Sequence, residues 1–268
     1  MLDAVSIIGC HVGPEDPVGE AVGCGAQIAQ IMLGDPQKWT APRVESPGGA
    51  AALREAAEAA GVLLVVHAAY VINVASLNNK VRIPSRQLLQ KTLLAAFEVG
   101  AIGVVVHGGH VGAEGDPLVG VDNWRKAVDG LEFPVPLFIE NTAGGARAMA
   151  RTLDAWRALW DGVSAGAGSA NVGVCLDTCH AHAAGLDLTT VVDDLRTITG
   201  RIDLVHANDS RDAAGSGADR HANIGQGQID PALIVSVVAE AGVPAVVETP
   251  GPASALAADI AYLRQRVV

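Results

Sequence analysis

The sequence predicts a single α/β domain, a (β/α)8 or TIM barrel that extends over residues 1–268. Strand-like and helix-like segments alternate from one end of the chain to the other, which is typical of a parallel sheet covered by helices. Eight strand-like segments are present, and about 250 residues is the usual length of a (β/α)8 barrel. Half of the residues, 50%, are hydrophobic, so the chain can fill one large core.

The expected strands and helices of the first half follow from apolar periodicity and from helix-ending glycines. The strands are short, continuous apolar runs, at 4–9, 27–33, 62–66 and 101–106. The helices are the segment from the turn at 14–17 to near Gly25, followed by 47–60 and 86–99. Gly61 and Gly100 are the glycines that end the last two helices.

The second half continues the alternation. The expected strands are 135–139, 172–176, 202–205 and 245–247. The expected helices are 117–130, 146–160, 189–199, 231–241 and 253–264. Two segments rich in Gly, Ser, Ala or Asp, 162–169 and 208–228, are interpreted as loops.

Six successive apolar runs end on a residue type that binds metal ions. These residues are His67, His107, Glu140, Asp177, His206 and Glu248. Because the strands of a parallel barrel all end on the same face, the six side chains are expected to surround one cavity. Turns favour Gly, Asn, Asp, Ser and Pro, so ordinary turn formation explains His and Glu at these positions poorly.

Three further residues extend this set. His180 follows Asp177 by one helical turn, and Asp219 and His221 lie two residues apart in the long loop. Imidazoles and carboxylates without a thiolate suit zinc, manganese or iron, and nine candidate ligands imply two or three ions. The cysteines are expected to be reduced and buried, and not to act as ligands. They are Cys10, Cys24, Cys175 and Cys179.

The formal net charge of −11, from 18 basic and 29 acidic residues, argues against a nucleic-acid partner. The four carboxylates of the candidate cluster carry a charge of −4, which three divalent ions would change to +2. A cationic cavity of this kind would attract a phosphate locally. Basic residues near the same loops are Lys80, Arg82, Arg86, Arg211 and Arg220. Without a signal-peptide segment or a long apolar run, we expect a cytoplasmic protein with no membrane partner.

Five segments resemble the signatures of the endonuclease IV family, the zinc-dependent apurinic/apyrimidinic endonucleases. They are VCLDTCHA at 174–181, IENTAGG at 139–145, HANDS at 206–210, DRHANIGQG at 219–227 and VETP at 247–250. The similarity extends over nearly the whole chain and looks most like the actinobacterial branch. It implies a (β/α)8 barrel that hydrolyses the phosphodiester 5′ to an abasic site and leaves a 3′-hydroxyl and a 5′-deoxyribose phosphate.

The resemblance also implies a ligand set with three zinc ions, part of which could be manganese. By resemblance, His67 and His107 hold the first ion, and Glu140 bridges it to the second. The second ion is also held by Asp177, His206 and Glu248. The third ion is held by His180, Asp219 and His221. Glu140 and Glu248 are the expected catalytic residues, and Glu248 would also orient the attacking hydroxide.

The expected partner is duplex DNA that contains an abasic site, bound by a monomer. Tyr70 matches the family's inserting tyrosine and Val71 its apolar neighbour; Arg82 and Arg220 are further expected DNA contacts. Departures from the family's pattern, at 13–17, at Ala69 and at 108–110, lie in DNA-facing loops. His11 and His110 are interpreted either as hydrogen-bond donors to the cluster or as ordinary residues of its rim.

Two other functions compete with the nuclease. Glu140, Asp177, His206 and Glu248 alone would suit the single metal of a sugar isomerase or epimerase with this barrel, but such an enzyme does not need the other five ligands. A non-catalytic protein that binds damaged DNA around a structural zinc should have closed coordination, whereas the set here implies open positions.

Overall fold

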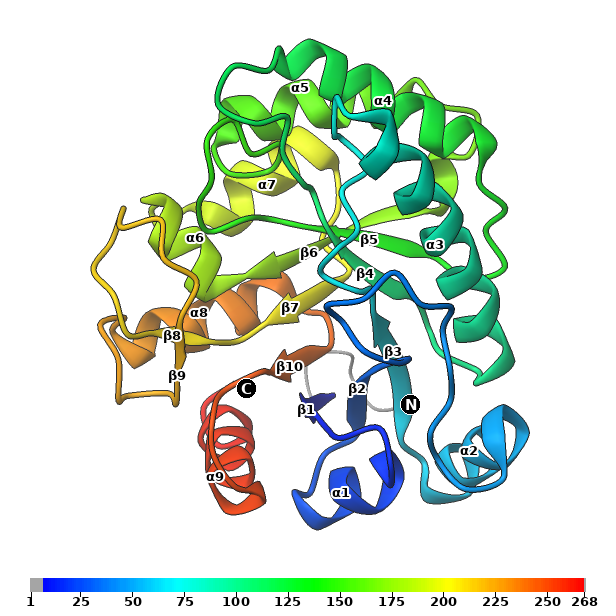
Figure 1. Ribbon diagram of the computed structural model, residues 1–268. Helices are drawn as coiled ribbons and strands as arrows, with labels where there is room; N and C mark the ends of the chain where they lie inside the picture. Colours follow the sequence, from blue (N-terminus) through cyan, green and yellow to red (C-terminus); the bar gives the residue numbers. More distant parts are fainter. Residues whose placement is uncertain (1–6, 268) are drawn as a thin grey trace.

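The computed structural model describes residues 7–267, and its strands close into a parallel barrel surrounded by helices (Figure 1). Around the barrel the strand order is β1-β10-β7-β6-β5-β4-β3-β2, and β2 pairs with β1 to close the ring. The strands are β1 (Ile8–His11), β2 (Ile28–Met32), β3 (Leu63–His67), β4 (Val104–His107), β5 (Leu137–Glu140), β6 (Val172–Asp177), β7 (Leu204–His206) and β10 (Ala245–Val247). The prediction of a (β/α)8 barrel is confirmed.

The helices follow the strands on the outside of the barrel. They are α1 (Pro17–Gly23), α2 (Gly49–Ala60), α3 (Asn79–Glu98), α4 (Pro117–Gly130), α5 (Leu153–Ser164), α6 (Thr178–Ala184), α7 (Val191–Thr199), α8 (Pro231–Ala241) and α9 (Ala253–Arg264). Helices α4 and α8 begin where the sequence predicts, because an Asp cap precedes a proline at the first helical position in each. Within residues 7–267 no helix is both long and apolar enough to cross a membrane.

Helix α3 begins at Asn79, seven residues before the predicted start at Arg86. The prediction placed the boundary after Pro84, but the Asn78 side chain accepts a hydrogen bond from the Lys80 N–H and caps the helix, which contains Pro84. Arg82 therefore lies on a helix.

Helix α5 begins at Leu153 instead of 146. The preceding segment hydrogen-bonds to the loop after β4: the Met149 N–H donates to the Gly109 carbonyl, and Ala148 forms a bridge with His110. Since these backbone groups are already paired, the helix starts only after Thr152, whose hydroxyl accepts from the Ala155 N–H. The helix then continues to Ser164, into the predicted loop.

The first strand and the long loop also differ from the prediction. The first strand was expected at 4–9 and is observed at Ile8–His11; residues 4–6 lie outside the described part of the chain. The predicted loop 208–228 contains a small antiparallel pair, β8 (Asp209–Ser210) and β9 (His221–Ala222), in which Ser210 is opposite His221. This pair fixes the position of His221.

The inside of the barrel contains an apolar layer to which seven strands each contribute one residue. The layer consists of Ile28, Val65, Val105, Phe138, Cys175, Leu204 and Val246. We call it the interior layer. A second, larger core lies between the barrel and the helices, and includes the fully buried Trp124 and Trp156.

Candidate metal centre

Each strand of the barrel carries a polar residue near its C-terminal end. In seven strands it is the last residue or the one directly after it, and in β2 it is Gln30, two residues before the end. Side chains two residues apart on a strand point to the same side, so the residue two positions after each member of the interior layer also points into the barrel. In β1, Gly9 takes the place of a layer residue, because a Cβ there would lie 1.7 Å from the Ile28 carbonyl oxygen. The polar residues, here called the mouth ring, are His11, Gln30, His67, His107, Glu140, Asp177, His206 and Glu248.

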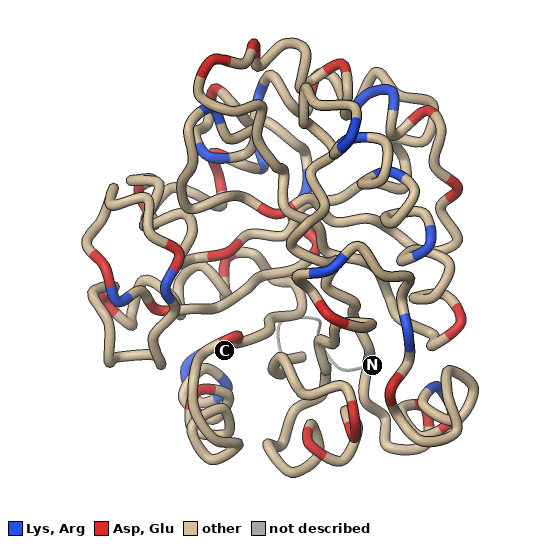
Figure 2. The backbone as a smooth tube through the Cα atoms, viewed as in Figure 1, with Lys and Arg blue, Asp and Glu red and all other residues tan. Residues whose placement is uncertain are grey.

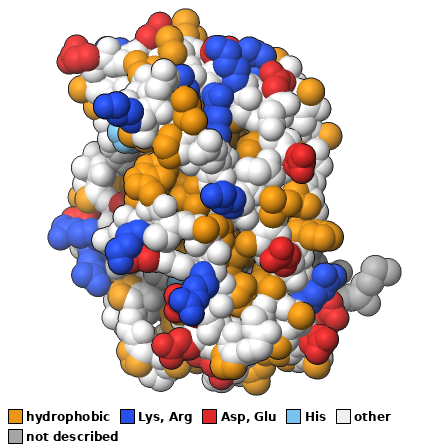
Figure 3. Space-filling view, turned by 45° about the vertical axis from the view of Figure 1, so that its right-hand side comes forward, with side chains coloured by type: hydrophobic (Ala, Val, Ile, Leu, Met, Phe, Trp, Pro, Cys, Tyr) orange, Lys and Arg blue, Asp and Glu red, His pale blue; other side chains and the backbone are white. Residues whose placement is uncertain are grey.

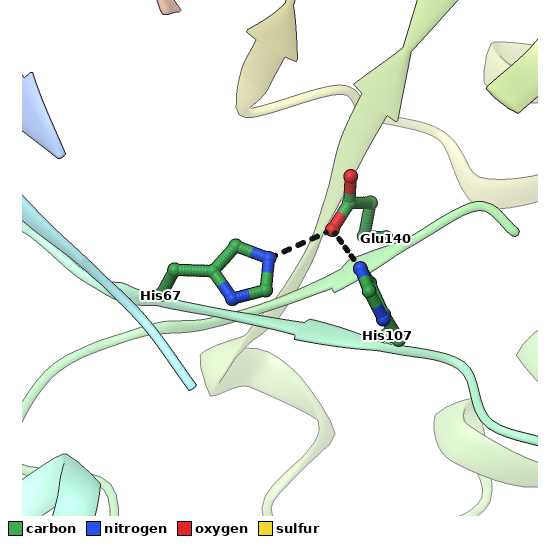
Figure 4. Close-up of side chains that lie close together, drawn as sticks. All are labelled: His67, His107 and Glu140. Carbon is green, nitrogen blue, oxygen red and sulfur yellow. Dashed lines mark hydrogen bonds and ion pairs between the residues drawn. The ribbon is translucent and has the colours of Figure 1, made fainter. Parts of the chain in front are cut away.

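The first group of candidate ligands comes from β3, β4 and β5. His67 Nε2 lies 3.2 Å and His107 Nε2 3.1 Å from the same oxygen of Glu140, Oε2 (Figure 4). The other ring nitrogen of His67, Nδ1, lies 2.8 Å from the Ala68 carbonyl oxygen and donates to it. This leaves the Nε2 lone pair of His67 directed at Glu140, an arrangement that fits a metal ion.

The second group shares Glu140 with the first. His206 Nδ1 lies 2.9 Å from Glu140 Oε1, 3.2 Å from Glu248 Oε2 and 3.9 Å from Asp177 Oδ2. Glu140, Asp177 and His206 are fully buried, and the Glu248 side chain is 14% exposed. The two oxygens of Glu140 face different groups, so this carboxylate could contribute to two sites.

The third group is formed by α6, the loop before β9 and the first residue of β9. Asp177 caps α6 by accepting from the His180 N–H at 2.7 Å, which sets the position of His180. The Nε2 atoms of His180 and His221 lie 3.1 and 3.2 Å from Asp219 Oδ1, yet both nitrogens are buried without a well-formed hydrogen bond. Buried polar atoms normally have partners, so two imidazole nitrogens converging on one carboxylate fit a metal site. The nine predicted ligands thus fall into three groups that could each hold an ion.

Charges inside the cluster shift its pKa values strongly. Burial opposes the ionisation of Glu140, but His206 and His107 hold the pKa of this carboxyl well below its usual range. Burial likewise opposes the charging of His180, yet Asp177, Asp219 and Glu140 raise the pKa of this imidazole well above its usual value. Without metal ions, protonated imidazoles therefore balance the carboxylates, and metal binding would have to release those protons.

The thiols of Cys175 and Cys179 lie close enough to other candidate ligands to share an ion with them. Cys175 belongs to the interior layer and is fully buried. Burial raises the pKa of Cys175 to about 12 and also raises the pKa of Cys179, and nearby carboxylates add to both shifts. The neutral thiol is therefore favoured, in line with the expected ligand set of imidazoles and carboxylates. All four cysteines are free and buried.

Three buried amide side chains hold the candidate ligands in place, and the sequence prediction gave none of them a role. Asn208 Nδ2 donates to Asp177 Oδ2 at 2.7 Å, and Asn208 Oδ1 accepts from the Glu248 N–H at 2.7 Å. Asn141 exchanges two hydrogen bonds with the backbone of Asp177. Gln30 contacts His206 and Glu248. The strand-end rule does not find Gln30, because this residue lies two positions before the end of β2. The available signal was an amide side chain in the middle of the apolar run 27–33.

Tyr70 is the most exposed aromatic residue beside the cluster. Its side chain is 54% exposed, and its ring lies 5.6 Å from that of His67 and 5.9 Å from that of His107. It lines two cavities at the mouth: one of about 820 Å³, which also contains His221 and Glu248, and one of about 300 Å³, which contains His107 and His180. Tyr70 therefore separates two spaces that both reach candidate ligands.

The other three predicted DNA contacts are engaged within the protein. Val71 is partly buried and packs against the larger core. Arg82 donates to the carbonyl oxygens of Ser76 and Leu77, and Arg220 pairs with Asp212. Lys and Arg are dispersed along the backbone (Figure 2) and, on the face in Figure 3, are scattered among hydrophobic and uncharged side chains.

His11 and His110 differ in their surroundings. His11 belongs to the mouth ring and its Nδ1 lies 3.1 Å from Gln30 Nε2; burial lowers the pKa of His11 to about 4. A neutral imidazole can accept at Nδ1, so His11 contacts the cluster through Gln30. The backbone of His110 instead exchanges hydrogen bonds with the Asn73 side chain.

The closed barrel and the His/carboxylate groups at its mouth define a class of metal-binding α/β barrels. In agreement, the model of the xylose isomerase-like TIM barrel family matches residues 18–266. A curated relative from Mycobacterium tuberculosis, "Probable endonuclease 4", is 53% identical over 97% of this chain and 98% of its own length. The chain belongs to the endonuclease IV family.

Solved structures agree with this membership. Endonuclease IV from Thermus thermophilus superposes with a TM-score of 0.82 at 30% identity, over 97% of this chain and 98% of that one. A D-tagatose 3-epimerase-like protein superposes with a TM-score of 0.76 at 21% identity, over 97% and 98% of the two chains, which shows a shared fold.

Proposed function

We propose that the protein hydrolyses the phosphodiester 5′ to abasic sites in duplex DNA and leaves a 3′-hydroxyl and a 5′-deoxyribose phosphate. As a member of the endonuclease IV family, it is a DNA-repair endonuclease. The abasic substrate, the point of cleavage and the metal centre go beyond this membership. We also propose that residues 1–268 form one catalytic domain that acts as a monomer.

The observation that carries the proposal is the division of nine ligand-type residues into three adjoining groups. We assign one zinc ion to each group, with manganese as an alternative in part. The first ion would be held by His67, His107 and Glu140, the second by Glu140, Asp177, His206 and Glu248, and the third by His180, Asp219 and His221.

Bound divalent ions would lower the pKa of a water and neutralise the developing charge on the phosphodiester oxygens. The chain's own residues complete the chemistry. Glu248 is ionised at neutral pH, because His206 overcomes the effect of burial and lowers the pKa of this carboxyl to about 2. Its side chain reaches the larger cavity, where it can orient the attacking water. Glu140, which faces two groups, keeps them at a fixed separation.

The duplex would contact the rim around Tyr70. The half-exposed Tyr70 ring stands where it could occupy the space of a displaced nucleotide, and we propose that Val71 supports it from the core. We also propose Arg82 and Arg220 as phosphate contacts; the Arg220 side chain remains 63% exposed despite its pairing with Asp212. A metal centre of net positive charge would offset the repulsion between DNA and a chain of net charge −11.

Incision of a duplex that contains one tetrahydrofuran abasic analogue tests the proposal. We expect cleavage 5′ to the analogue, no cleavage of the same duplex without it, and loss of activity after prolonged chelation. Protein that binds the damaged duplex but leaves it intact in excess zinc would contradict a nuclease. Metal analysis by mass spectrometry should give two to three equivalents per chain; a single equivalent would favour a sugar isomerase or epimerase.

A further inference from the structure

Gln30, on β2, is fully buried in the mouth ring, and its amide uses both its oxygen and its nitrogen. Gln30 Oε1 lies 2.8 Å from His206 Nε2. Gln30 Nε2 lies 2.5 Å from Glu248 Oε1 and 3.1 Å from His11 Nδ1. One amide therefore joins two candidate ligands of the second ion to His11, which is not one of the nine predicted ligands.

The chemistry of these partners allows one orientation of the amide. An ionised carboxylate only accepts hydrogen bonds, so the amide nitrogen of Gln30 must face Glu248. The amide oxygen then faces His206, and His206 must carry a proton on Nε2 in order to donate to it. Nδ1 of His206, which faces Glu140 and Asp177, is then the nitrogen available to a metal ion, and the second N–H of Gln30 is left for His11.

The other imidazoles show what this contact does. In His67, His180 and His221, the nitrogen that does not face the carboxylate of its own ligand group is paired with a backbone carbonyl. These carbonyls belong to Ala68, Asn141 and Glu248, at 2.8, 2.9 and 3.3 Å. In His206 the acceptor is the Gln30 side chain. Such contacts fix the tautomer and the ring orientation of a metal-binding histidine.

We propose that Gln30 is a positioning residue of the metal centre that holds His206 and Glu248 in the orientations required by the second ion, with His11 securing the amide. This inference rests on the proposed metal centre. It confines the effect of Gln30 to the second group, because no candidate ligand of the third group contacts the amide. His11 acts through Gln30 and is not a ligand.

The test compares Gln30→Met with Gln90→Met. Methionine has a similar shape but cannot replace the amide's hydrogen bonds. Gln90, on α3, also makes two hydrogen bonds, both to the backbone of Glu132, so its variant controls for the loss of an amide's hydrogen bonds outside the site. Zinc affinity is measured by titration against a chromophoric chelator, and Co²⁺ substitution gives the absorption spectrum of each site.

We expect Gln30→Met to weaken one zinc equivalent by about 10- to 100-fold and to change its Co²⁺ spectrum, with the other equivalents unaffected. The kcat for incision should fall by a similar factor while KM stays near the wild-type value, because the amide does not contact DNA. Gln90→Met should behave as the wild type. Gln30→Glu, which keeps an acceptor for His206 but loses the donor to Glu248, should also weaken the same equivalent.

The outcomes separate this inference from the proposed function. If the wild type binds its zinc and cleaves abasic DNA, but Gln30→Met and Gln30→Glu retain full zinc affinity and kcat, the role of Gln30 is refuted and the nuclease stands. If the wild type binds no zinc, the metal centre itself is refuted. Should Gln30→Met fail to fold, the zinc affinity of Gln30→Glu decides, since unchanged binding there contradicts the proposal.

Discussion

The interior layer and the mouth ring lie two residues apart on the same seven strands, with Val65 beneath His67 and Phe138 beneath Glu140. The interior layer gains free energy by removing apolar surface from water, about 25 cal/mol per Å², and needs no partner of specific geometry. The mouth ring instead buries charges, which is unfavourable unless each charge is paired. We infer that the layer maintains the barrel and that the ring, at some expense of stability, provides the chemistry.

Among substitutions that test this comparison, Glu248→Gln in the mouth ring is expected to have the largest effect, and this effect is on the rate of incision. The substitution keeps the shape of the side chain but removes a charged ligand and the group that orients water. We expect kcat to fall by about 10²- to 10⁴-fold, with a midpoint of thermal unfolding close to that of the wild type. Initial rates of incision at saturating DNA, together with circular dichroism melting, measure both quantities.

Glu20→Gln is the matched control for Glu248→Gln, because Glu20 lines the same cavity without belonging to the ring. Its rate should stay near that of the wild type. Near-normal turnover of Glu248→Gln would show that the second group is misassigned.

The next effect concerns the layer. The Phe138 ring fills the space above Gly103 and Gly173, where added Cβ atoms would lie 2.4 and 3.0 Å from it. Phe138→Ala should lower the free energy of unfolding by about 3–5 kcal/mol, because it leaves a cavity inside the barrel. Urea denaturation measures this loss.

Phe97→Ala provides the control, since Phe97 is 52% exposed and should change stability by less than about 0.5 kcal/mol. Folded Phe138→Ala should bind as many zinc equivalents as the wild type. If it bound fewer, the interior layer would also determine metal binding, which contradicts the division of roles between layer and ring.

The smallest expected effect is the pH dependence of the stability of the metal-free protein, prepared with a chelator. Burial opposes the charging of His221, but Asp219, Asp177 and Glu248 raise the pKa of this imidazole from 6.5 to about 9. The folded state thus binds more protons than the unfolded state between these values, so its extra stability is complete below pH 6.5 and is lost as the pH rises through 9. We expect a decrease on the order of 1 kcal/mol, because Asp219 is half exposed.

Urea unfolding of the metal-free protein at several pH values between 6.5 and 9 measures this decrease in the free energy of unfolding. His221→Gln should abolish the decrease, and zinc should reduce it, since the ion replaces the proton. If the stability of the metal-free wild type depended on pH in the same way as that of His221→Gln, the shifted pKa would be contradicted.

The elements that the sequence predicted best carry their signals locally. Helices α4, α8 and α9 have the predicted bounds, and an Asp-Pro pair marks the starts of the first two. The predicted starts of α3 and α5 were wrong for two reasons. Pro84 is a misleading signal for a helix start, because it is tolerated inside α3, and the segment before α5 pairs with the loop after β4, a contact that is distant in sequence. Six of the eight ring positions were predicted as ligands because each ends an apolar run.

The sequence by itself determined the barrel and the ligand types, since both depend on residue identity and on spacing along one strand. Only the tertiary structure decided which ligands meet. Strand register places His107 beside Glu140 and Asp177 beside His206, and closure of the barrel brings Gln30 from β2 to His206 and Glu248, more than 170 residues away. These contacts depend on the register and closure of all eight strands, which no local stretch of sequence specifies.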